Sequence, residues 1–149
     1  LIKAEKSADG TYTDEAKAAA KARAEEILAE FNSGDKTEDS FAELANKYSE
    51  DEGSNTNGGL YENIAKGQTV QEFNDFCFAG HKAGDTGIVY GDNGSYAGYH
   101  VMYFVGEGEQ YSDYLAKNSL LTTDMNAWIE ELTSAYETSV GGGINFVGK

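Results

Sequence analysis

The strongest constraint on the fold is an alternating segment at residues 97–105, which reads AGYHVMYFV. In an extended strand, successive side chains point to opposite faces. One face then carries Tyr99, Val101, Tyr103 and Val105, and the other carries His100, Met102 and Phe104. The chain has only two histidines, and this one falls on an apolar face. His100 is therefore either a core histidine with satisfied ring nitrogens or part of a polar site.

A turn precedes this strand. Residues 92–95 read DNGS, and residues 88–91, IVYG, are typical of a short strand. Asn-Gly between two such segments predicts a hairpin, and hairpin-joined strands pair antiparallel. The Asn93-Gly94-Ser95 triplet also fits a glycosylation pattern, but the turn accounts for it. Residues 1–3 are typical of the end of another strand.

Helices are expected in four separate segments. Thr13 caps the first, which Gly34 ends, and capping boxes of Ser40 with Glu43 and Thr69 with Glu72 begin the next two. The fourth spans residues 111–139 and ends at the glycines that follow. Because helices and strands are segregated rather than alternating, the fold class is α+β.

The composition excludes several functions. A formal net charge of -15 argues against binding nucleic acid or an anionic membrane surface, because both need clustered Lys and Arg. The simplest interpretation of this negative charge is that it keeps the protein soluble. The alternative is a preference for basic or unfolded partners. The single cysteine, Cys77, forbids an internal disulfide, and its apolar setting favours a buried thiol over a nucleophile.

No metal or cofactor is expected. The only metal-like spacing resembles a calcium loop and consists of Asp51, Asn55, Asn57 and Glu62. It fails because Thr56 stands where that loop needs glycine and Gly53 brings no side-chain ligand. His81 is interpreted as an exposed turn residue, and no serine lies in a nucleophile elbow.

Five short motifs occur in order: FAELANKYSED, NGGL, GQTVQEFNDFCF, AGDTG and GYHVMYF. Together they resemble the parvulin-type peptidyl-prolyl isomerases, especially the PrsA- and SurA-type foldases that bacteria export. The similarity runs from about Phe41 to Val105. It implies a small antiparallel sheet of about four strands surrounded by helices. The expected domains are an isomerase domain at 1–107, its first strand truncated, and a helical extension at 108–149.

The resemblance also implies roles for individual residues. His100 falls on the histidine of the closing strand, and Asp51 falls where the family carries an Asp or Cys beside the reacting amide. The expected substrate-binding residues are Phe73, Val70, Thr69, Phe78, Gly58 and Leu60. Phe73 is expected to line an open pocket for the proline ring.

The chain also departs from the family pattern. Gly59 replaces the usual Asp of the Gly-Gly loop, Tyr61 the usual Gly, and Ala97 stands where many members have a hydroxyl or Tyr. The sequence begins with two strand-like residues and without an initiator Met, so it is interpreted as a piece of a longer protein. The family's first-strand histidine would lie two residues before Leu1. These departures keep open the alternative of a catalytically weak chaperone module on the same fold.

The function implied is non-covalent cis-trans isomerisation of X-Pro bonds in exported, unfolded proteins. The expected partners are unfolded or proline-containing polypeptides, without nucleic acid and without membrane contact by this chain. The expected location is outside the bacterial cytoplasm. We also expect the C-terminal helix to dock on the sheet domain or on a neighbouring molecule through Trp128, Ile129 and Leu132.

Overall fold

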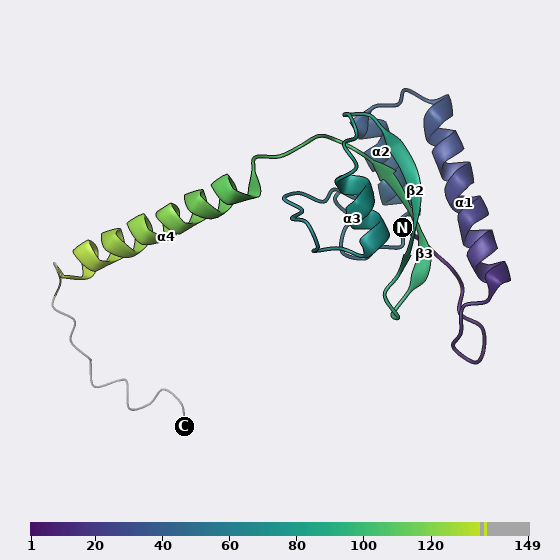
Figure 1. The fold of residues 1–149 in the computed structure, drawn as a ribbon, viewed down its shortest axis with the longest axis horizontal. Helices are drawn as coiled ribbons and strands as arrows, with labels where there is room; N and C mark the ends of the chain where they lie inside the picture. The colour runs from purple at the N-terminus through teal and green to yellow at the C-terminus, as the bar shows by residue number, and fades with distance from the viewer. Residues whose placement is uncertain (135, 137–149) are drawn as a thin grey trace. The chain divides into compact units, whose positions relative to one another are not determined.

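The structure is a computed structural model that describes residues 1–134 and 136 (Figure 1). The chain divides into two compact units, Leu1–Gly108 and Glu109–Lys149. The first contains β1 (Ile2–Lys3), α1 (Asp14–Ser33), α2 (Glu38–Tyr48), α3 (Gln71–Cys77), β2 (Thr86–Asp92) and β3 (Ala97–Tyr103). The second contains α4 (Tyr111–Ser134). This arrangement confirms the α+β class.

The sheet is antiparallel with the strand order β1-β3-β2. β2 and β3 form the predicted hairpin, in which Asp92 faces Ala97 and Val89 faces His100. Within the described residues the sheet has three strands rather than about four. Residues 58–64 stay a loop, and Gly58 and Gly59 have φ angles of 75° and 73°, which a strand cannot adopt.

Two helices begin differently from the prediction. Thr13 caps α1 as expected, its hydroxyl accepting from the Ala16 amide. α2 begins earlier, because Thr37 and Ser40 cap it reciprocally in place of Ser40 and Glu43. α3 begins after Val70 without any side-chain cap, so the predicted box of Thr69 with Glu72 is wrong.

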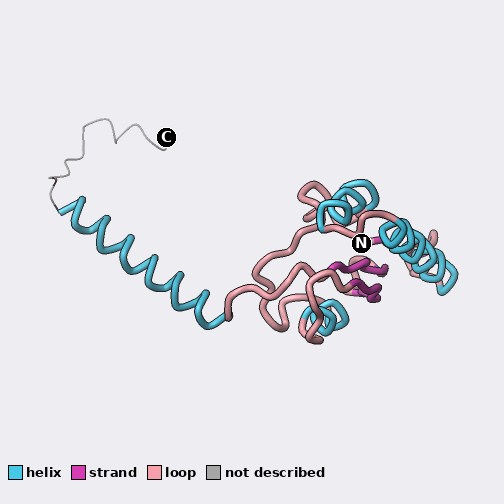
Figure 2. Tube along the Cα trace, turned by 90° about the horizontal axis from the view of Figure 1, so that it is seen from above, coloured by secondary structure: helices cyan, strands magenta, loops and turns pink. Residues whose placement is uncertain are grey.

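The two faces of the sheet are covered by different helices. Figure 1 shows α1 and α3 on opposite sides of the β2–β3 ribbon, and Figure 2 shows the helices around the strands from above. On one face, Ala20, Ala24 and Ile27 of α1 pack with Tyr99 and Val101. On the other, buried side chains of α3 pack with Met102 and Phe104. The alternation predicted for β3 is therefore confirmed.

α4 is a separate helix of 24 residues, none of whose side chains is buried. The predicted stripe of Trp128, Ile129 and Leu132 is exposed on it. Docking through this stripe stays a prediction. The part of the predicted helix at 135 and 137–139, and the glycines expected to end it, lie outside the described residues. Among the described helices, none combines the length and apolarity needed to cross a membrane.

Candidate functional site

His100 occupies the centre of the candidate site, on the face of β3 that α3 covers. Its ring meets the Phe73 ring edge-on, with centroids 5.4 Å apart and an interplanar angle of 88°. Phe73 in turn packs with Phe76 and Met102. The histidine therefore lies at the border of an apolar cluster rather than within it.

A glycine on the neighbouring strand makes room for the imidazole. A Cβ atom added to Gly91 would lie 2.7 Å from His100 Nε2 and 3.2 Å from the Tyr96 hydroxyl oxygen. That space is used by a hydrogen bond between Tyr96 and His100 Nε2, at 2.9 Å. Tyr96 directly precedes β3, so the hairpin itself supplies the partner that holds the ring.

The His100 imidazole is neutral at physiological pH. Burial is the main cause and lowers the pKa of His100 to about 4, although the Asp51 carboxylate acts in the opposite direction. A neutral imidazole has one donor and one acceptor nitrogen. It can therefore exchange a hydrogen bond with the Tyr96 hydroxyl and still offer its second nitrogen to another group.

Asp51 lies in the turn after α2 and is held by two hydroxyl groups. Ser54 and Tyr61 both donate to its Oδ2 atom, at 2.5 and 2.6 Å, and the Gly53 amide donates to Oδ1 at 3.4 Å. Burial raises the pKa of Asp51, but the hydrogen bonds from Ser54 and Tyr61 outweigh it, and the pKa lies below its ordinary value. Asp51 is thus an anion at neutral pH.

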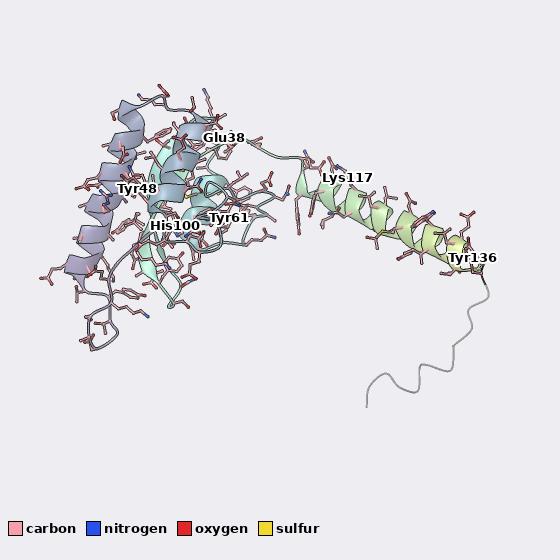
Figure 3. All side chains as sticks on the ribbon, turned by 180° about the vertical axis from the view of Figure 1, so that it is seen from behind. Glu38, Tyr48, Tyr61, His100, Lys117 and Tyr136 are labelled. Atoms are coloured by element: carbon pink, nitrogen blue, oxygen red, sulfur yellow. The ribbon has the colours of Figure 1, made fainter. Side chains whose placement is uncertain are left out.

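Tyr61 connects the Asp51 turn with helix α3. Its hydroxyl contacts Asp51, while its ring lies edge-on to Phe73 at 5.8 Å, on the way to His100. Figure 3 shows the labelled Tyr61 and His100 side chains in the same part of the Leu1–Gly108 unit. Half of the Tyr61 side chain remains exposed (50%), so the site has an open aromatic rim.

The remaining predicted binding residues are less closely grouped. Val70 packs with the α3 cluster, whereas Phe78 and Leu60 are exposed. Gly58 contacts α2, because its amide donates to Asn46 Oδ1 and an added Cβ would lie 2.7 Å from the Ala42 Cβ. The Thr69 hydroxyl oxygen is buried and has no hydrogen-bond partner among the described residues.

Phe73 is more buried than expected. Only 8% of it is exposed, and it belongs to the core cluster on the α3 face. This burial differs from the expected open pocket, and the rings of Tyr61 and His100 lie against Phe73. Its role in binding a proline ring stays a prediction. Truncation of Phe73 would therefore cost stability as well as ligand contact.

Sequence reasoning missed four contributors: Tyr96, Gly91, Ser54 and the contacts of Tyr61. Tyr96 lies four residues before His100, next to a hairpin turn, and that spacing is the one signal that could have identified it. Tyr61 stood out only as a departure from the family pattern. Its contacts depend on how the loop at residues 49–70 returns to Asp51.

Comparisons with known proteins find a family model and a relative that match the chain. The sequence matches the family model for the PPIC-type PPIASE domain over residues 1–104. It is 42% identical over 79 residues to Foldase protein PrsA 3 of Bacillus cereus, an alignment covering 53% of this chain and 25% of the Bacillus protein. The chain therefore spans about a quarter of the length of that relative. No solved structure matches the chain significantly.

Proposed function

The chain belongs to the PPIC-type peptidyl-prolyl cis-trans isomerase family, and from this premise we propose that the cluster of Asp51, Phe73 and His100 is its catalytic site. The reaction of the family is rotation about the peptide bond that precedes proline. The observation that carries the proposal is the continuous series of contacts from Asp51 through Tyr61 and Phe73 to His100.

The barrier to this rotation comes from amide resonance and is roughly 18–20 kcal/mol. The planar amide carries more charge separation than the twisted transition state. An apolar, water-poor site therefore destabilises the planar form relative to the twisted one. The apolar side chains of Phe73 and Val70 would supply such an environment for the proline ring. Phe78 and Leu60, which are exposed, and Thr69 and Gly58 would be the further substrate-binding residues.

The polar residues would act on the rotating carbonyl and on the imide nitrogen. A negative charge at Asp51 disfavours the negative charge that resonance places on the carbonyl oxygen, and so favours the twisted state. His100, held by Tyr96, would fix the direction of the polar groups at the floor of the site. None of these steps forms a covalent bond to the protein.

For the whole protein, we infer a foldase that acts on unfolded, proline-containing chains outside the bacterial cytoplasm. The resemblance to exported bacterial foldases supports this location, and the similarity to a protein named as a foldase supports the role. In this view the unit at Leu1–Gly108 catalyses and the α4 unit extends it.

Exchange NMR on an Ala-Pro or Glu-Pro peptide tests the proposal directly. The chain of residues 1–149 should raise the cis-trans exchange rate of the peptide, and His100→Ala should lower that gain. Val101→Ala, on the opposite face of β3, is the matched control and should keep the rate of the folded protein. Equal rates with and without protein would contradict the proposal.

A second function is favoured by the exposed apolar side chains at the rim. Leu60, Tyr61 and Phe78 are each at least 40% exposed, which suits retention of unfolded chains without turnover. Binding of proline peptides with no effect on their exchange rate would favour this chaperone role over catalysis.

A further inference from the structure

Tyr61 makes one contact through its hydroxyl and one through its aromatic ring, a combination that only a tyrosine provides. Its hydroxyl reaches the Asp51 carboxylate at 2.6 Å, and its ring lies against Phe73. A glycine, which the family pattern led us to expect here, would make neither contact. The tyrosine therefore adds a connection between the anionic and the apolar parts of the site.

The hydrogen bonds to Asp51 are concentrated on one oxygen. Ser54 Oγ and Tyr61 Oη both donate to Oδ2, while Oδ1 receives only the long contact from the Gly53 amide. Two short hydrogen bonds, one from within the Asp51 turn and one from a residue ten positions along the chain, restrict the rotation of the carboxylate. Oδ1 is left as the atom with unused acceptor capacity.

The two donors differ in their surroundings. Ser54 is buried (4% exposed) and belongs to the same turn as Asp51, since its amide also donates to the Asp51 carbonyl. Tyr61 lies ten residues along the chain and is half exposed. Ser54 thus holds Asp51 from inside the turn, whereas Tyr61 holds it from the rim where a peptide would enter.

We propose that Tyr61 is a positioning residue for Asp51, whose hydroxyl fixes the carboxylate toward the rotating amide while its ring supports the proline-binding face of Phe73. The inference rests on the proposed function of the site. The hydroxyl and the ring have separable effects: the first acts on turnover through Asp51, and the second acts on peptide binding.

Few titratable groups lie near Asp51, so the pKa of its carboxyl can be measured with little interference from other titrations. Among the described residues, they are the Tyr61 and Tyr96 phenols and the His100 imidazole. Titration of the Asp51 carboxylate by carbon NMR should therefore report the loss of a hydroxyl donor directly. Removal of either Tyr61 or Ser54 as a donor should raise the pKa of Asp51 toward its ordinary value.

The test compares Tyr61→Phe with Ser54→Ala and Tyr61→Ala in the full chain. Tyr61→Phe should lower kcat by about tenfold, the loss expected for one hydrogen bond to a charged group, with little change in peptide affinity. Ser54→Ala, the matched control on the same oxygen, should shift the Asp51 titration in the same direction. Tyr61→Ala should in addition weaken peptide binding.

A double-mutant cycle decides whether Tyr61 acts through Asp51. In an Asp51→Asn background, Tyr61→Phe should have almost no further effect on kcat. An unchanged rate and Asp51 titration in Tyr61→Phe would overturn the inference and leave the proposed function intact. Absence of isomerisation by the unaltered chain would overturn the proposed function, while the Asp51 titration would still report whether Tyr61 holds the carboxylate.

Discussion

β3 presents two faces of contrasting chemistry to the helices that cover it. On the α1 side, Ala24 is completely buried and the strand contributes Tyr99 and Val101 to an apolar cluster. On the α3 side, the same strand contributes His100, which has a hydroxyl partner and lies near an anionic carboxylate. One strand thus serves a structural core and a polar site.

The lengths of the two covering helices account for much of this difference. α1 has 20 residues, and its small alanines at positions 20 and 24 allow close approach to the sheet. α3 has only seven residues, so it cannot cover the strands along their length. On that face, Tyr61 and Tyr96 bring hydroxyl groups to Asp51 and His100. On the other face, the alanines of α1 bring methyl groups. The α3 face of β3 therefore receives polar groups from residues outside the helix that covers it.

The sharpest test of this contrast uses two buried phenylalanines, one for each face. Phe31 on α1 is 3% exposed and Phe73 on α3 is 8% exposed. Each change to alanine should lower the free energy of unfolding by about 3–5 kcal/mol. Only Phe73→Ala should also weaken binding of a proline peptide, measured by calorimetry on the folded fraction.

The milder changes Phe31→Leu and Phe73→Leu keep this comparison usable where the alanine variants fail to fold. Equal peptide affinity for both leucine variants would mean that the α3 face holds no proline ring.

The second test alters adjacent residues of β3. His100→Ala should lower the isomerisation rate by about a hundredfold, which corresponds to 2.7 kcal/mol. Val101→Ala should instead lower the free energy of unfolding and keep the rate of the folded protein, because its side chain faces α1. Exchange NMR and urea denaturation together measure both effects.

A third substitution, Gly91→Ala, tests the same ring without removing it. An added methyl group 2.7 Å from His100 Nε2 must displace the imidazole, so the rate should fall although His100 is present. A Gly91→Ala variant as fast as the parent would mean that the ring position is unimportant for catalysis.

These contrasts also show how much of the site can be predicted from sequence. The face of His100 follows from alternation, because a strand's period of two leaves no choice of side. Asp51 followed from a motif. The contacts of Tyr61 were not predictable, because they depend on the path of an irregular loop in which Gly58 and Gly59 adopt positive φ angles. The start of α2 was misplaced because Thr37 and Ser40 can both cap a helix, and that of α3 because it begins after a valine with no side-chain cap.

Acid should destabilise the α3 face through His100. Because the pKa of His100 is about 4 in the folded state and 6.5 in the unfolded state, the unfolded chain binds more protons between these values. The stabilisation is therefore complete above pH 6.5 and is lost as the pH falls toward 4, by at most about 1.4 kcal/mol per pH unit.

His100→Gln is the control for this pH dependence, since glutamine retains a hydrogen bond to Tyr96 but does not titrate. Urea denaturation at pH 7, 6, 5 and 4 should give a shallower decline for the variant than for the parent. The Asp51 carboxylate, whose pKa is lowered, loses its contribution only at more acidic pH. Parallel declines for the two proteins would contradict a buried, neutral His100.

The smallest expected effects come from two threonines, one whose hydroxyl is hydrogen-bonded and one whose buried hydroxyl has no partner among the described residues. The Thr13 hydroxyl caps α1, so Thr13→Ala should lower the free energy of unfolding by about 1 kcal/mol, and Thr13→Ser should restore it.

The Thr69 hydroxyl oxygen is buried beside α3 without a partner among the described residues. Thr69→Val removes a desolvated polar group at nearly constant shape and should stabilise the fold by about 1 kcal/mol. Neither change should alter peptide affinity if the α1 face is purely structural and Thr69 lies behind the site. Weaker peptide binding by Thr69→Val, with unchanged stability, would instead show that this hydroxyl turns toward the substrate, and it would extend the polar side of the site to the start of α3.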